Sequence, residues 1–146
     1  MTESTNKPGE GQDTIAERLA AAGVQPTAQR IEIASALLDR PRHLSADCLS
    51  SILRERGVQV SKATVYNTLK LLCDKGLIKA IVVDPNRVFY DSTTELHHHF
   101  YHVDSGELTD IPADQVHFAA LPALPEGTER QGVDVIVRIR DAGLPG

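Results

Sequence analysis

The sequence has few of the residues that mark a disulfide scaffold, a zinc–thiolate site or a membrane protein. Its 146 residues include two cysteines, one methionine, no tryptophan and only 4% aromatic residues. Cys48 and Cys73 form no CxxC pair, which excludes an all-cysteine zinc cluster and a disulfide framework. Both lie beside leucines, which predicts that they are core residues.

No apolar run approaches the roughly 20 residues that span a bilayer. The polar start MTESTNKPGEGQ has no apolar core and therefore lacks the pattern of a secretory signal. Hydrophobic residues (41%) and charged residues (24%) are close to average globular usage. These features predict a folded cytoplasmic protein with no membrane association.

Charge and histidine are distributed unevenly along the chain, whose net charge is −5. Residues 1–87 carry 12 basic and 10 acidic side chains, whereas residues 88–146 carry 3 basic and 10 acidic ones. Five of the six histidines lie between His97 and His117. This asymmetry predicts two lobes with different tasks.

The first lobe has the pattern of several short helices followed by a β-hairpin. Stripes of apolar residues at helical spacing are each preceded by a residue that can cap a helix: Thr27, Ser45 and Ser61. Two β-rich runs in KAIVVDPNRVFYD predict the hairpin. This order is typical of a winged helix-turn-helix DNA-binding domain. We expect it over residues 13–91, after a flexible tail of residues 1–12.

One helix, in the segment SKATVYNTLKLLCDKG, is the candidate recognition helix. Its apolar stripe is expected to face the core, which leaves five polar side chains on or beside the opposite face: Lys62, Thr64, Tyr66, Asn67 and Lys70. Lys62 and Lys70 suit phosphate groups. Asn67 can read adenine, and Tyr66 can contact a thymine methyl group or a phosphate. A solvated helix face without a function is the alternative interpretation, and the hairpin that follows shifts the balance towards DNA binding.

The second lobe, residues 92–146, is expected to be a small α/β domain. Side chains alternate along an extended segment, so His97 and His99 would share one face while His98 points to the other. ELTDI is a strand candidate, IPADQVHFAAL is expected to be a short helix that carries His117, and VDVIVRIR has the alternation of a strand. A plain polar loop is the alternative for the histidine run. Imidazoles and carboxylates without thiolate suit Mn(II), Fe(II) or Zn(II), and the oxygen content favours the first two.

Several segments together resemble the ferric uptake regulator (Fur) superfamily of metal-dependent bacterial repressors: QPTAQR, HLSAD, SKATVYNTL, the hairpin and HHHFY…SGELTDIP. The similarity runs from about Asp13 to Arg140. HHHFY followed by GELTDIP, without a CxxC pair, is most similar to the iron response regulator (Irr) branch. The resemblance implies a homodimeric regulator, mostly a repressor, that responds to metal, haem or both. It would bind an AT-rich inverted repeat in double-stranded DNA and control iron and haem homeostasis.

The resemblance also implies a regulatory metal site that links the two lobes. Carried over position by position, its ligands are His43, Asp91, His97, His99 and Asp110. Three nitrogens and at least two oxygens make the set similar to that of the peroxide-sensing (PerR) branch, which implies Mn(2+) or Fe(2+). A metal held from both lobes would fix the angle between them. No structural zinc held by four cysteines is implied, so VDVIVRIR is the candidate for the strand that joins two subunits.

A second metal or haem site is implied at His98 and His117, and in the Irr branch the histidine run is itself assigned to haem. The QPTAQR motif adds Arg30 to the candidate DNA-binding residues. One alternative function is a peroxide- or manganese-sensing repressor of the PerR or Mur type. A more remote alternative is a small non-haem metalloenzyme. A five-ligand set leaves little room for the open position that catalysis needs, so we expect no enzyme activity.

Overall fold

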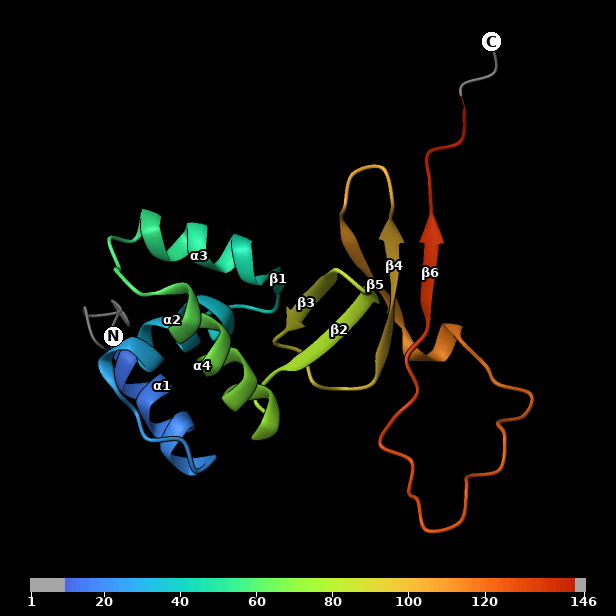
Figure 1. Cartoon of the computed structure of the whole chain (residues 1–146), viewed down its shortest axis with the longest axis horizontal. Coiled ribbons are helices and arrows are strands. Elements are labelled where there is room, and N and C mark those ends of the chain that lie inside the picture. Colours follow the sequence, from blue (N-terminus) through green and yellow to red (C-terminus); the bar gives the residue numbers. More distant parts are fainter. Residues whose placement is uncertain (1–9, 144–146) are drawn as a thin grey trace, which may run out of the picture. The chain divides into compact units, whose positions relative to one another are not determined.

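The computed structural model describes residues 10–143, with the side chains described from residue 14 onwards (Figure 1). The chain divides into two compact units, Met1–Thr94 and Glu95–Gly146. Each unit has its own sheet. None of the helices in the described part of the chain has the length and apolar character needed to cross a membrane.

The first unit combines four helices with a three-stranded antiparallel sheet. The elements follow in the order α1 (Glu10–Ala21), α2 (Ala28–Leu38), β1 (His43–Ser45), α3 (Ala46–Glu55), α4 (Lys62–Asp74), β2 (Lys79–Asp84) and β3 (Arg87–Asp91). The sheet order is β1-β3-β2. The expected helices and hairpin are therefore confirmed. β1 was not predicted, because three residues are too few for a periodic pattern.

Local capping explains where three of these helices begin and where two of them end. The side chains of Thr27, Ser45 and Ser61 each accept a hydrogen bond from the backbone N–H three residues later, which confirms the predicted N-caps of α2, α3 and α4. Gly57 and Gly76 follow α3 and α4 with φ of 75° and 74°, values that glycine adopts without steric cost. The chain itself therefore specifies these helix boundaries.

The core of the first unit consists of aliphatic side chains from all four helices. Leu19, Leu37, Leu49, Leu53 and Leu69 have no exposed surface. On α4, the buried positions are Val65, Thr68, Leu69 and Leu72, whereas Lys62, Tyr66, Asn67 and Lys70 are exposed. This packing orients the candidate recognition helix.

Two expectations for the first unit need correction. Residues 10–12, expected to belong to the tail, are part of α1, because no proline interrupts this helix and its one glycine, Gly11, costs only about 1 kcal/mol. Cys48 is exposed rather than a core residue, since the buried stripe of α3 runs through Ala46, Leu49 and Leu53. Cys73 is half-buried and packs against the core, as expected.

The second unit is built on a mixed three-stranded sheet in the order β5-β4-β6. β4 (His97–His102) pairs antiparallel with β5 (Leu108–Pro112) and parallel with β6 (Ile136–Ile139), which lies beside it in Figure 1. The strands expected in ELTDI and VDVIVRIR are thus present, although β6 is shorter than its sequence pattern.

The short helix expected in IPADQVHFAAL does not form as predicted. Only a single 3-10 turn, η1 (Ala113–Gln115), is present, and Val116 after it has an extended backbone with φ of −121°. An isolated helix of this length is marginal, and Pro122 prevents further turns that would stabilise it. His117 therefore lies in a coil segment and is exposed.

Candidate metal centre

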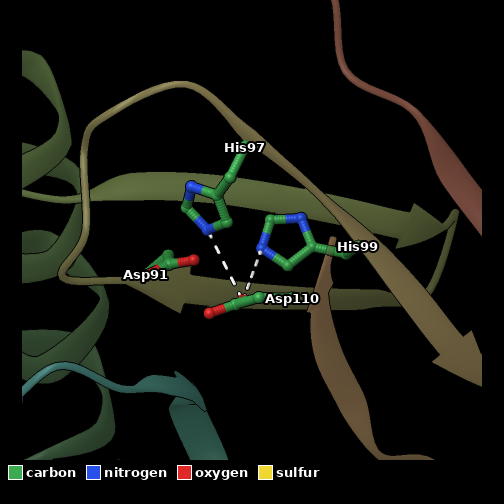
Figure 2. Close-up of side chains that lie close together, drawn as sticks. All are labelled: Asp91, His97, His99 and Asp110. Atoms are coloured by element: carbon green, nitrogen blue, oxygen red, sulfur yellow. Dashed lines mark ion pairs between the residues drawn. The ribbon is translucent and has the colours of Figure 1, made fainter. Parts of the chain in front are cut away.

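Three potential metal ligands meet on one face of the β4–β5 hairpin. His97 and His99 are two residues apart on β4, and Asp110 lies directly opposite His99 on β5. One ligand atom from each residue lies within 4.8 Å of the others. Nε2 of His97 and Nε2 of His99 are each 3.5 Å from Oδ1 of Asp110 (Figure 2). The predicted alternation of the histidine run thus places these two imidazoles together.

The hydrogen bonding of His97 orients its ring so that Nε2 faces Asp110. Its Nδ1 lies 2.7 Å from the carbonyl oxygen of Glu95, so Nδ1 is the atom that donates a proton in this contact. Nε2, which faces Asp110, then carries the lone pair in the neutral ring. Metal-binding histidines characteristically have their second nitrogen bound to a carbonyl or carboxylate in this way.

Burial differs among the three side chains. The side chain of His99 is 2% exposed and that of His97 is 11% exposed, whereas Asp110 is 57% exposed. The two imidazole rings are tilted by 59°, with their centroids 4.6 Å apart. The cluster therefore has two enclosed nitrogen donors and one oxygen donor that solvent reaches. Such a mixed donor set suits Mn(II), Fe(II) or Zn(II).

The other two proposed ligands are neighbours within the first unit. His43 on β1 is the cross-strand partner of Asp91, the last residue of β3, which is also labelled in Figure 2. Asp91 is only 1% exposed. The His43 ring stands edge-on to Phe89, with ring centroids 6.4 Å apart. Cross-strand pairing thus brings together two residues that are far apart in the sequence.

His98, a candidate for a second site, has a hydrogen-bonding role on the opposite face of β4. It is 2% exposed, and its Nδ1 accepts a hydrogen bond of 3.0 Å from the backbone N–H of Val135. Its ring also stands edge-on to Phe118 at 6.0 Å. Nδ1 is therefore occupied by a backbone donor. The second site at His98 and His117 stays a prediction.

The candidate DNA-contacting residues of α4 are on its outer side. Lys62, Tyr66, Asn67 and Lys70 are exposed, and Tyr66 keeps 44% of its surface accessible. Thr64 is half-buried, and its hydroxyl lies 2.8 Å from that of Ser61, so it also supports the helix cap. Lys70 forms an ion pair of 3.0 Å with Asp74, one turn further along the helix. Exposed pairs of this kind are weak and leave the lysine available for a phosphate.

A pocket of about 290 Å³ connects α4 with the N-terminus of α2. Arg30, Asn67 and Thr64 line it, together with three residues that the sequence did not predict as DNA contacts: Thr27, Gln29 and Thr68. Nη1 of Arg30 donates a hydrogen bond of 3.1 Å to the Gln25 carbonyl, and this bond holds the Arg30 side chain beside the pocket. For Thr27 and Gln29, the sequence signal that could have indicated DNA contact was their position in the QPTAQR motif.

The pKa values of Cys73 on α4 and Tyr90 on β3 are both raised, which indicates structural roles. Burial raises the pKa of the Cys73 thiol, and the Asp74 carboxylate raises it further. Burial also raises the pKa of Tyr90, with smaller contributions from Cys73 and Tyr66. A thiol with a raised pKa is a poor thiolate ligand, which agrees with the assignment of Cys73 to the core.

The model of the "Ferric uptake regulator family" matches residues 21–131. The peroxide-responsive repressor PerR of Staphylococcus epidermidis is 30% identical over 98 residues, which are 67% of this chain and 65% of that protein. The chain thus spans just under two thirds of that relative.

Two solved structures have the same fold. The ferric uptake regulator of Pseudomonas aeruginosa with manganese aligns with a TM-score of 0.65 and 24% identity, covering 87% of this chain and 97% of the other. A zinc-bound manganese uptake regulator aligns with a TM-score of 0.64 and 22% identity, covering 88% of this chain and 99% of the other.

Proposed function

The chain belongs to the ferric uptake regulator family, and from this premise we propose that it is a metal-responsive DNA-binding transcription regulator, mostly a repressor. We interpret the first unit as a winged helix-turn-helix domain and the second as the dimerisation and sensing domain. The observation that carries the proposal is the pair of histidines on one face of β4, with Nε2 of both rings directed at Asp110. The metalloenzyme alternative has no comparable support, because the matched family is one of regulators.

The proposed regulatory site combines these three residues with His43 and Asp91. Only five residues separate Asp91 from His97, so the chain allows both to reach the same ion. A bound divalent cation would neutralise the carboxylates and hold the five side chains around one point. Mn(2+) or Fe(2+) is the proposed ion, since three nitrogens and at least two oxygens with no thiolate favour these metals.

The proposed DNA interface is the outer face of α4 with the adjoining end of α2. Lys62 and Lys70 would contact phosphates, and Tyr66 and Asn67 would contact base edges. Arg30 lines the pocket beside them. A homodimer would present two such helices to successive major grooves of an AT-rich inverted repeat.

The effector distinguishes the branches of the family that the chain resembles. The PerR and Mur branches imply Fe(2+) or Mn(2+), and the Irr branch implies haem at His97, His98 and His99. His98 and His99 have at most 2% of their surface exposed, so a small ion reaches this place more readily than a porphyrin. We therefore propose a metal as the principal effector, and haem is tested as the alternative.

The test begins by identifying the DNA. Mn(II)-loaded full-length protein is used to select duplexes from a randomised library, and an AT-rich inverted repeat is the expected product. Fluorescence anisotropy at one fixed salt concentration then compares the apo, Mn(II)-loaded and haem-loaded protein. Mn(II) is expected to change the Kd by a factor of about 5–150, the usual range of allosteric coupling. If haem alone changes the Kd, the proposed metal response is refuted and the Irr assignment replaces it.

Two substitutions separate DNA reading from metal sensing. Tyr66→Ala should weaken binding to the selected duplex while calorimetric Mn(II) affinity stays unchanged. His43→Ala should retain DNA binding but lose its dependence on Mn(II), and His102→Ala on β4 is the matched histidine control. Failure to select any duplex, or equal affinity of the apo and loaded wild type, would refute the proposed function.

A further inference from the structure

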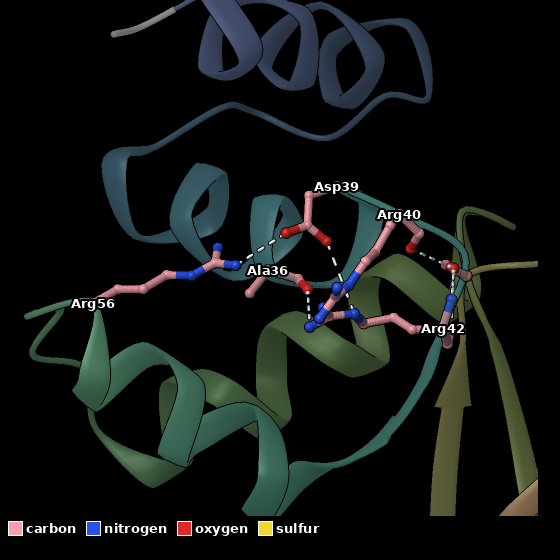
Figure 3. A network of polar contacts seen from close by, with 6 residues as sticks. Ala36, Asp39, Arg40, Arg42 and Arg56 are labelled. Atoms are coloured by element: carbon pink, nitrogen blue, oxygen red, sulfur yellow. Dashed lines mark hydrogen bonds and ion pairs between the residues drawn. The ribbon is translucent and has the colours of Figure 1, made fainter.

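A polar network in the first unit links residues 39–42, the connector between α2 and β1, to the C-terminal ends of α2 and α3 (Figure 3). Its centre is Arg42, whose side chain is only 11% exposed. Nη1 of Arg42 donates to the carbonyl of Ala36, in the last turn of α2, at 3.2 Å. Nε of Arg42 lies 3.9 Å from Oδ1 of Asp39, and Oδ2 of Asp39 accepts a hydrogen bond of 2.9 Å from Arg56. Arg56 is the C-cap residue of α3.

The backbone of Arg42 extends this network to the ends of β1 and β3. Its N–H donates to the hydroxyl of Ser92 at 3.0 Å, and the Ser92 N–H donates to the Arg42 carbonyl at 3.0 Å. The Ser92 hydroxyl also lies 3.2 Å from that carbonyl and 3.4 Å from the carbonyl of Arg40. Arg42 directly precedes His43, and Ser92 directly follows Asp91. The network therefore borders both metal ligands proposed for the first unit.

The chemistry of arginine suits this connecting role. The last carbonyls of an α-helix lack intrahelical partners, and the helix dipole favours a cation beside them. The guanidinium is planar and presents its donors in a fixed fork, so Arg42 donates to the Ala36 carbonyl while its charge attracts the Asp39 carboxylate 3.9 Å away. A movement of the His43–Asp91 strand ends would then displace the C-terminal end of α2, and through Asp39 that of α3.

We propose that Arg42 is a positioning residue that couples metal occupancy at His43 and Asp91 to the helices that carry the DNA interface. α4 packs against both α2 and α3, so their displacement changes the presentation of its outer face. This inference rests on the proposed function. Without Arg42, the connector between α2 and β1 would absorb the movement of the strand ends.

A coupling role and a merely structural role predict different binding data. A residue that only stabilises the fold changes DNA affinity by the same factor in the apo and loaded protein. A coupling residue changes the ratio of the two Kd values, which measures the coupling itself. The ratio of the two Kd values is therefore the decisive readout. Mn(II) affinity by calorimetry and the melting temperature are measured alongside it.

The experiment compares the full-length wild type with Arg42→Gln and Arg40→Gln on the selected duplex, with and without Mn(II). Arg40 is the matched control, because it lies in the same connector and joins the network through its backbone carbonyl. The wild type and Arg40→Gln should show a Kd ratio in the range of about 5–150, and Arg42→Gln a ratio near one. Arg42→Gln should still bind Mn(II).

Each outcome decides the inference. A Kd ratio in Arg42→Gln equal to that of the wild type overturns the role of Arg42 and leaves the proposed function intact. A ratio near one in the wild type itself refutes the proposed function together with this inference. If Arg42→Gln does not fold, Asp39→Asn replaces it, because this change weakens the link to Arg56 but leaves the bonds of Arg42 to Ala36 and Ser92. Asp39→Asn should lower the ratio at least twofold, and an unchanged ratio overturns the proposal.

Discussion

Replacing Asp110 with asparagine tests the metal centre most directly. Asp110→Asn keeps the shape of the side chain but removes the charged oxygen that both histidine Nε2 atoms face at 3.5 Å. Without metal, the change should cost less than about 1 kcal/mol, because the carboxylate is 57% exposed and contacts of this kind are screened by water. With metal, the effect should be much larger.

The expected size follows from binding linkage. At a free Mn(II) concentration of about 100 times the Kd, binding stabilises the wild type by about 2.7 kcal/mol. If the lost ligand weakens binding by about 100-fold, the same concentration equals the Kd of the variant and stabilises it by only about 0.4 kcal/mol. The difference of about 2.3 kcal/mol corresponds to a shift in melting temperature of about 5–9 °C for a chain of this size.

The assay is thermal unfolding followed by circular dichroism, with and without Mn(II). Asp114→Asn is the matched control, because it makes the same chemical change at an exposed position just beyond β5. The control should keep the full Mn(II)-induced shift. An equal shift in Asp110→Asn and the wild type would show that Asp110 does not bind the metal and would refute this reasoning.

Three further changes test the fold around the sites. Leu69→Ala should lower the free energy of unfolding by about 2–5 kcal/mol in urea titrations, because this fully buried side chain of α4 leaves a cavity; a loss below about 1 kcal/mol would contradict the packing. His98→Leu should leave the Val135 N–H without its acceptor, which costs about 1–3 kcal/mol and speeds amide exchange at Val135; unchanged exchange would count against this bond. Cys48 should be alkylated faster than Cys73, since burial raises the pKa of the Cys73 thiol. The pKa of the Cys73 thiol is higher in the folded chain than in the unfolded chain, so the protonated thiol contributes its full stability below pH 9.0. This contribution is lost as the pH rises through the pKa of the folded chain. Cys73→Ala should therefore reduce the loss of stability at alkaline pH.

Local sequence signals predicted the parts of the fold that depend on neighbouring residues. Thr27, Ser45 and Ser61 cap helices because a side-chain oxygen reaches an N–H only three residues away. His97 and His99 share a face because alternation is a property of any extended strand. The spacing of the apolar residues on α4 likewise predicted which side of this helix is exposed.

Features that depend on distant segments were decided by the tertiary structure alone. β1 is too short to be recognised by itself, and its pairing with β3 places His43 opposite Asp91. Pairing with β4 selected four residues of VDVIVRIR as β6, and the helix expected around His117 was reduced to one 3-10 turn.

The sequence by itself thus determined where α2, α3 and α4 begin, the alternation of the histidines and the types of metal donor, because each follows from local geometry and side-chain chemistry. The tertiary structure decided that Asp110 faces both imidazoles, that His98 binds the Val135 N–H, and that Arg42 joins two helix ends to Ser92. Those contacts require long-range strand pairing or chain reversal, which no local periodicity encodes.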